Sequence, residues 1–261
     1  MTESPQAKPR SRLEFFSLIA HAVIVVLVGC SIPRMISRFF TPPEQRGFYV
    51  AYEGGRCSEG KKGERFGANA YVIGPNTLMT AAHLVIKEGR KKNPADLITM
   101  PVKIKRGGAC FDTVITAVDY ANDLLFLAAP VDDPPFPVAD DGPYAGQIVT
   151  SRGYEYIGPG IDNYRFLYHS GVVKNVTRKD CKAGRSSNRF EVHERGPGQG
   201  IFPGGTSGSA FFDDRGRVVG LLIRSDRATY AVAVSADTIK EAVRATYECL
   251  AIPCFVTAKC D

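Results

Sequence analysis

Residues 130–137, Pro-Val-Asp-Asp-Pro-Pro-Phe-Pro, divide the chain into two parts. Four prolines fall within these eight residues. Proline lacks the backbone N–H that the interior of a strand or helix needs, so neither element is expected to pass through this segment. The sequence therefore predicts a connection here, between two regions of similar length.

Short apolar segments, separated by turn residues, lie on both sides of this connection. Their length and alternation are typical of β-strands. The strands expected before it are residues 48–52, 68–73, 78–80, 97–105, 114–118 and 124–128, the fourth of which Pro101 interrupts. Those expected after it are residues 148–151, 166–169, 172–176, 190–193, 210–212, 218–223 and 230–234. Residues 235–249 have an apolar stripe at helical spacing and predict a closing helix. Two small antiparallel barrels, at about 47–130 and 138–235, fit this pattern.

The first 46 residues are of a different kind. Residues 1–12 are polar, residues 13–32 are mainly apolar, and residues 33–46 predict a linker. A helix of about 18 residues spans about 27 Å, which is close to the thickness of a bilayer core. Three fates stay open: a signal anchor, a cleaved signal peptide, or a lipoprotein signal, because Leu27-Val28-Gly29-Cys30 resembles a bacterial lipobox. Each predicts a membrane-anchored or exported protein whose remaining residues lie outside the cytosol, in the periplasm or extracellular space.

Composition narrows the remaining classes of protein. A hydrophobic fraction of 44% is enough for a core and excludes a disordered chain. The net charge of +6 permits an acidic partner, but basic clusters such as residues 87–92 lack interleaved aromatics, so no nucleic acid is expected as a partner. Of the seven cysteines, six follow the apolar segment and can form up to three disulfides, with the connectivity open. No C-x-x-C pair occurs, and we expect no metal site.

Three short segments carry reactive side chains. In Leu78-Met79-Thr80-Ala81-Ala82-His83, a strand and two small residues lead to a histidine. Asp123 directly precedes an apolar strand, where a partly buried carboxylate needs a partner such as an imidazolium. Asp119 is a nearby alternative without the apolar residues directly after it. In Pro203-Gly204-Gly205-Thr206-Ser207-Gly208-Ser209-Ala210, glycines on both sides of Ser207 allow a sharp turn that brings backbone N–H groups close to a ligand.

The order His, Asp, Ser, with the proline-rich connection after the Asp, resembles the chymotrypsin-like (trypsin-like) serine protease family, and its compact bacterial and viral members in particular. The resemblance covers residues 47–249. It implies an all-β fold of two antiparallel six-stranded β-barrels with a C-terminal helix, here preceded by an N-terminal hydrophobic helix. The protease domain would then occupy residues 47–261. The α/β-hydrolases run in the order Ser, Asp, His and are not matched.

The resemblance also implies a role for each residue of the site. Ser207 would attack the scissile carbonyl, His83 would take its proton, and Asp123 would orient His83. The backbone N–H groups of Gly205 and Ser207 would form the oxyanion hole. The primary substrate pocket would be formed by Ile201, Ile223, Ser225 and Thr229.

A serine endopeptidase that needs no metal or organic cofactor and acts on a protein or peptide substrate is therefore expected. Residues 13–32 would associate it with a membrane. The alternative is a catalytically impaired binding module on the same fold. The sequence departs from the digestive enzymes at Thr206, where they have an Asp that pairs with a new amino terminus after zymogen cleavage, so activation by that route is not expected.

Overall fold

The computed structural model describes residues 43–59, 67–86, 96–97, 100–156, 164–178, 180–181, 185–194, 206–226, 229–248 and 254–256. The chain separates into two compact units, Met1–Pro43 and Glu44–Asp261. The hydrophobic segment predicted at residues 13–32 lies outside the described residues. Within the described ranges, no helix is long and apolar enough to cross a membrane.

The first barrel of the Glu44–Asp261 unit contains the strands before the proline-rich connection. Its strands are β1 (Phe48–Glu53), β2 (Gly67–Gly74), β3 (Thr77–Ala81), β4 (Val102–Arg106), β5 (Ala109–Asp119) and β6 (Leu124–Ala128). They pair in the order β5-β4-β1-β2-β3-β6, and a further pairing of β5 with β6 closes the barrel. All of these pairs are antiparallel.

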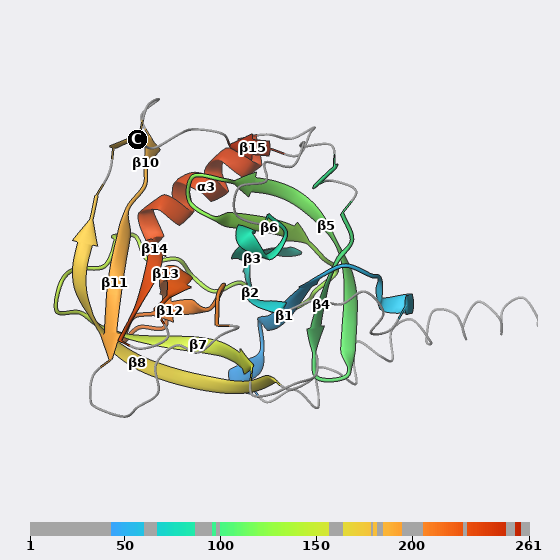
Figure 1. The fold of residues 1–261 in the computed structure, drawn as a ribbon, viewed down its shortest axis with the longest axis horizontal. Helices are drawn as coiled ribbons and strands as arrows, with labels where there is room; N and C mark the ends of the chain where they lie inside the picture. Colours follow the sequence, from blue (N-terminus) through green and yellow to red (C-terminus); the bar gives the residue numbers. More distant parts are fainter. Residues whose placement is uncertain are drawn as a thin grey trace, which may run out of the picture. The chain divides into compact units, whose positions relative to one another are not determined.

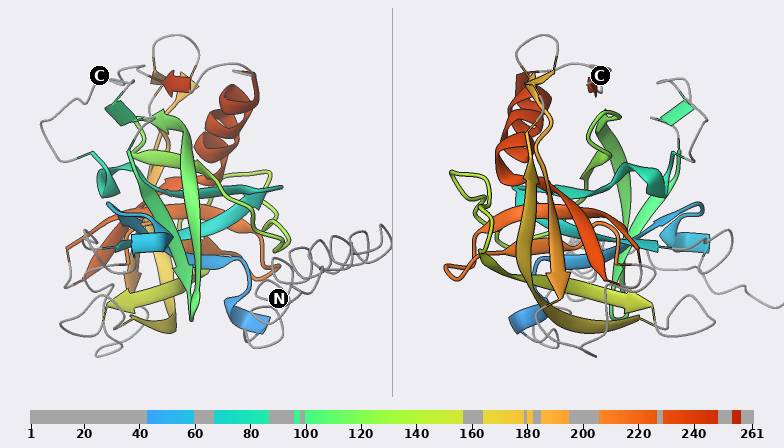
Figure 2. Two further views of the ribbon diagram at one scale, coloured as in Figure 1. Left: turned by 90° about the vertical axis from the view of Figure 1, so that its right-hand side faces the viewer. Right: turned by 60° about the vertical axis from the view of Figure 1, so that its left-hand side comes forward.

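The second barrel contains strands that follow the connection. Its strands are β7 (Ile148–Tyr156), β8 (Tyr164–Thr177), β11 (Arg189–Glu194), β12 (Ala210–Phe212), β13 (Val218–Ser225) and β14 (Tyr230–Ser235), closed in the order β11-β14-β13-β12-β7-β8. Figure 1 shows the first barrel in blue to green and the second in yellow-green to orange-red. The helix α3 (Ala236–Glu248) follows β14 directly and lies outside both barrels (Figure 2). Two antiparallel barrels and a C-terminal helix are thus confirmed.

Among the residues that the structure describes, three apolar clusters hold this unit together. One contains only residues of the first barrel and the segment that leaves it, and another contains only residues of the second barrel and its flanks. The third joins both barrels and α3 through residues such as Phe48, Phe212 and Ile239. Strand β1 contributes side chains to two of these clusters: Tyr49 and Ala51 belong to the first barrel's cluster, and Phe48 belongs to the cluster that both barrels share. This alternation follows from the two-residue period of a strand.

The proline-rich connection is fixed at two points. The Phe136 ring lies 4.7 Å from the Phe48 ring and 5.2 Å from the Phe212 ring, so it packs between the barrels. Asp133 is buried and bonds Arg106 Nη1 at 2.7 Å. It also accepts a hydrogen bond from the Tyr49 hydroxyl, and burial raises the pKa of Tyr49. A buried carboxylate needs such partners, and these ones attach the connection to the first barrel.

The observed elements differ from the prediction at several positions. The strand predicted at residues 97–105 begins only at Val102, directly after Pro101, while residues 96–97 are helical. The strands predicted at 166–169 and 172–176 form one strand, β8. A Cβ at Gly171 would lie 2.3 Å from Val192 Cγ1, so this glycine permits close packing and makes no turn. Finally, β15 (Cys254–Val256) pairs in parallel with β5.

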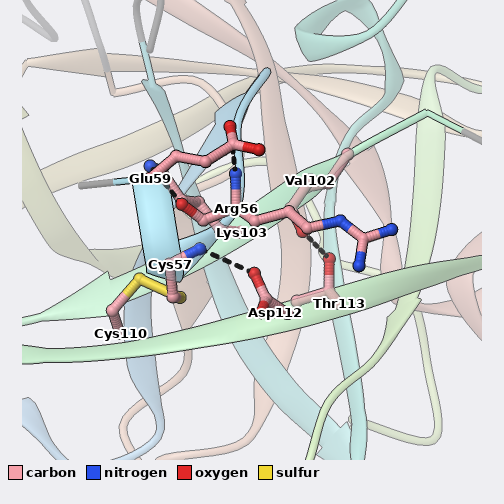
Figure 3. Close-up of a disulfide and its surroundings, with 8 residues drawn as sticks. All are labelled: Arg56, Cys57, Glu59, Val102, Lys103, Cys110, Asp112 and Thr113. Carbon is pink, nitrogen blue, oxygen red and sulfur yellow. Dashed lines mark hydrogen bonds between the residues drawn. A yellow bond between two sulfur atoms is a disulfide. The ribbon is translucent and has the colours of Figure 1, made fainter. Parts of the chain in front are cut away.

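A disulfide joins Cys57, in the short helix η2 (Cys57–Glu59), to Cys110 at the start of β5 (Figure 3). The backbone N–H of Cys57 also donates to Asp112 Oδ1 at 2.8 Å, so both a covalent bond and a hydrogen bond join η2 to β5. The bond connects the loop after β1 to the β4–β5 hairpin. A disulfide among the six cysteines after the apolar segment is therefore present, as expected.

We expect the double substitution Cys57→Ser and Cys110→Ser to lower the free energy of unfolding by about 4 kcal/mol, because it releases a loop with a sequence separation of 53. Urea unfolding without reductant measures this change. Ser58→Ala, in the same turn, is the control and is expected to change stability by less than about 0.5 kcal/mol. A loss below about 1 kcal/mol in the double variant would contradict the prediction.

Candidate active site

His83 and Asp123 lie side by side at one end of the first barrel. His83 belongs to η3 (Ala82–Leu84), directly after β3, and Asp123 directly precedes β6. Strands β3 and β6 pair with Ala81 opposite Leu124, which places the two residues at the same edge. The His83 Nδ1 atom lies 2.6 Å from Asp123 Oδ2, and the His83 backbone N–H donates to Asp123 Oδ1 at 2.7 Å. One carboxylate therefore fixes both the ring and the backbone of the histidine.

The pair is held firmly but stays accessible. Asp123 has φ +58°, a left-handed conformation that is uncommon for a residue with a side chain. Its carbonyl oxygen accepts a hydrogen bond from the Ala82 N–H at 2.9 Å. The side chains of His83 and Asp123 are 38% and 26% exposed, so the imidazole is open to a ligand.

Asp119, the alternative to Asp123 in the sequence, bonds the turn between the two residues. It is buried, and its Oδ1 accepts hydrogen bonds from the backbone N–H groups of Ala121 and Asn122 at 3.1 and 3.2 Å. Its Oδ2 accepts from Asn122 Nδ2 at 2.8 Å. Asp119 thus shapes the turn that ends at Asp123, while Asp123 bonds the histidine. Burial raises the pKa of Tyr120 in the same turn.

Ser207 lies in a turn before β12 that packs against the first barrel. The Ser207 carbonyl oxygen accepts a hydrogen bond from the Asn69 N–H on β2 at 2.7 Å. Gly208 has φ +81°, and a Cβ there would lie 2.0 Å from the Asn69 carbonyl oxygen and 2.9 Å from Thr80 Oγ1. Because Thr80 belongs to β3, the strand that leads to His83, the serine turn of the second barrel packs against the strand that presents the histidine.

Asn69 makes the contact between the barrels polar as well as close. It is 2% exposed, its Nδ2 donates to the Tyr154 carbonyl at 2.8 Å, and its Oδ1 accepts from the Tyr154 N–H. Its own carbonyl accepts from Thr80 Oγ1 at 2.6 Å. The sequence interpretation missed this residue. The sequence did contain a signal, because Asn69 is an amide residue within an otherwise apolar strand. A polar group buried in such a strand normally has a hydrogen-bond partner, so a specific contact could have been expected here.

The structure describes only part of the predicted oxyanion hole and pocket, because Gly205 and Ile201 lie outside the described residues. Ile223, near the end of β13, is buried in the cluster shared by the barrels, and Ser225 ends that strand. Thr229 lies in a turn, where its N–H and hydroxyl both donate to the Asp226 carboxylate, at 2.8 and 2.5 Å. No group of His, Cys, Asp and Glu in the described ranges could hold a metal ion.

Two closed antiparallel barrels, with a His–Asp pair on one and a glycine-flanked serine of the other packed against its strands, define the chymotrypsin-like class of serine proteases. The sequence model of the trypsin-like peptidase domain family matches residues 68–221. The chain belongs to this family. A comparison with curated proteins gives no match.

Solved structures with the same fold are distant in sequence. An inactive mutant form of Rv3671c from M. tuberculosis H37Rv has a TM-score of 0.56 at 17% identity, over 79% of this chain and 89% of that chain. The active form of the Rv3671c protease has a TM-score of 0.56 at 18% identity, over 77% and 83%. A serine endoprotease from Yersinia pestis has a TM-score of 0.53 at 12% identity, over 78% and 62%. At these identities the likeness supports the fold alone.

The substitution Gly208→Ala tests whether the serine turn depends on its contact with Asn69. The new Cβ would meet a backbone oxygen, so we expect the free energy of unfolding to fall by more than about 2 kcal/mol, measured by urea unfolding. Gly216→Ala is the matched control, because Gly216 also has positive φ, at +72°, but a Cβ added there would meet no atom within 4 Å. Equal losses in both variants would contradict the importance of the contact.

Proposed function

We propose that this protein is a serine endopeptidase that hydrolyses peptide bonds through His83, Asp123 and Ser207. The observation that carries the proposal is the 2.6 Å contact between His83 Nδ1 and Asp123 Oδ2, because it orients the imidazole and assigns the role of base to Nε2. The packing of the Ser207 turn against β2 and β3 supports the assignment of the nucleophile.

In the proposed reaction, Ser207 Oγ attacks the scissile carbonyl while His83 Nε2 takes its proton. His83 then gives this proton to the leaving amine, and water repeats the sequence on the acyl-enzyme. Asp123 accepts the Nδ1–H hydrogen bond, which selects the tautomer and stabilises the imidazolium. The backbone N–H groups of Gly205 and Ser207 would bind the oxyanion, each contributing about 3 kcal/mol to the transition state. Water is the second reactant, and the protein's own side chains and backbone supply the catalytic groups of the proposed reaction.

Residues 47–261 form the protease domain in this proposal, and it acts outside the cytosol while residues 13–32 anchor the chain or direct its export. The Cys57–Cys110 disulfide supports this location, since disulfides persist in oxidising compartments. Thr206 is buried beside the nucleophile and carries no charge, so the proposed enzyme needs no ion pair with a newly cut amino terminus.

Purified full-length protein is expected to cleave a denatured protein or a mixed peptide library, with fragments detected by mass spectrometry. Ser207→Ala should reduce kcat/KM at least about 1,000-fold, because it removes the nucleophile. The control is Ser151→Ala, a buried serine on β7, which should retain the wild-type rate. Absence of cleavage by a folded wild-type protein would favour the catalytically impaired binding module.

The same library gives the preference at the residue before the cut. Ile201 and Ile223 predict a small or medium apolar residue there, favoured at least about tenfold over Lys or Arg, because no carboxylate is expected at the base of the pocket near Ile201 and a cation buried there would be unpaired. A preference for Arg would show that the pocket is assigned to the wrong residues.

A further inference from the structure

The turn that carries Asp123, residues 119–123, is here called the Asp loop. Its last residue has φ +58°, and such a conformation persists only where the surrounding structure holds it in place. Asp119 supplies part of that hold from within the loop, through its bonds to Ala121 and Asn122. These local bonds shape the loop, but they do not fix it relative to the barrel that carries Ser207.

Two side chains, one just before β11 and one at its first residue, donate hydrogen bonds to the Asp loop. The Ser187 hydroxyl donates to Asn122 Oδ1 at 2.7 Å, and Arg189 Nη2 donates to the Ala121 carbonyl at 2.9 Å. Asn122 and Ser187 are 6% and 4% exposed, so their hydrogen bond is protected from water. In such surroundings an unpaired amide oxygen would be costly.

The chain next to Ser187 is hydrogen-bonded to the start of α3. The next residue, Asn188, donates its N–H to Thr238 Oγ1 at 2.9 Å, and its carbonyl oxygen accepts from the Ser235 N–H at 2.9 Å. Ser235 ends β14, and Thr238 lies in the first turn of α3. A continuous set of contacts therefore runs from the second barrel and α3, through Ser187 and Asn122, to the residue that bonds His83.

We propose that Asn122 and Ser187 are positioning residues of the site, which set the place of the Asp123 carboxylate relative to the barrel that carries Ser207. This inference rests on the proposed function, because it assigns the residues a part in the same reaction. Both are buried and neither is expected to touch the substrate. Their loss should therefore lower kcat and leave KM nearly unchanged. A displacement of a catalytic group by about 1 Å costs about 100-fold in rate.

The test uses Ser187→Ala, with Ser187→Thr as the variant that restores the hydroxyl and Ser151→Ala as the control, a buried serine on β7 that pairs with β8 and β12. Ser187→Ala should lower kcat at least about tenfold, with KM within about twofold of wild type. Arg189→Met, at a half-buried position, is a second variant. It should also lower kcat, because it removes the hydrogen bond to the Ala121 carbonyl.

A second readout does not depend on activity. The backbone N–H groups of Ala82 and His83 donate to Asp123, so their hydrogen exchange reports directly on its position. In Ser187→Ala we expect these two amides to exchange at least about tenfold faster, while amides of β13 keep their rates. Ser187→Thr should restore both the exchange rates and kcat.

Each other result overturns a specific claim. If Ser187→Ala matches Ser151→Ala in kcat and in exchange, the positioning role is wrong. If exchange rises equally throughout the barrels, Ser187 is only a stabilising residue. If the wild-type protein cleaves no peptide while Ser187→Ala still speeds the hydrogen exchange of the Ala82 and His83 amides, the proposed function fails. The role of Ser187 in positioning Asp123 is then still supported.

Discussion

No side chain fits between Gly208 and the carbonyl oxygen of Asn69, and the arrangement of the site depends on this contact. A Cβ at Gly208 would lie 2.0 Å from that oxygen. The glycine therefore lets the serine turn of one barrel approach strands β2 and β3 of the other, and the Asn69 N–H then fixes it through the Ser207 carbonyl. Because β3 leads directly to His83, this approach decides where Ser207, the proposed nucleophile, lies relative to His83, the proposed base.

The two barrels hold each other through apolar and polar contacts at the same interface. Aromatic rings and α3 form the apolar cluster that both share, and Phe136 of the connection packs within it. Buried hydrogen bonds fix the position of one side of this interface relative to the other: Asn69 bonds the backbone of Tyr154, and Ser187 bonds Asn122. Apolar burial supplies most of the driving force for association, whereas such directional bonds select one arrangement among those of similar packing.

Much of the fold and part of the site could be predicted from the sequence, because they depend on local pattern. Strand alternation and turn residues located most of the strands, and His83, Asp123 and Ser207 lie in short segments with recognisable neighbours. The contacts that join the barrels could not be predicted in this way, since Ser187 and Asn122 are 65 residues apart and Asn69 and Tyr154 are 85 apart. The strands predicted at 166–169 and 172–176 proved to be one strand that includes Gly171, because sequence does not distinguish a glycine that turns the chain from one that admits a neighbouring side chain.

Covalent labelling of the full-length protein with a fluorophosphonate, followed by peptide mapping, tests most directly whether these contacts build a working nucleophile. We expect one adduct for each chain, on Ser207, formed at a rate that falls at least about 1,000-fold in His83→Ala, because the hydroxyl then lacks its base. An adduct on another residue, or equal labelling of Ser207 with and without His83, would contradict the proposed role of the pair.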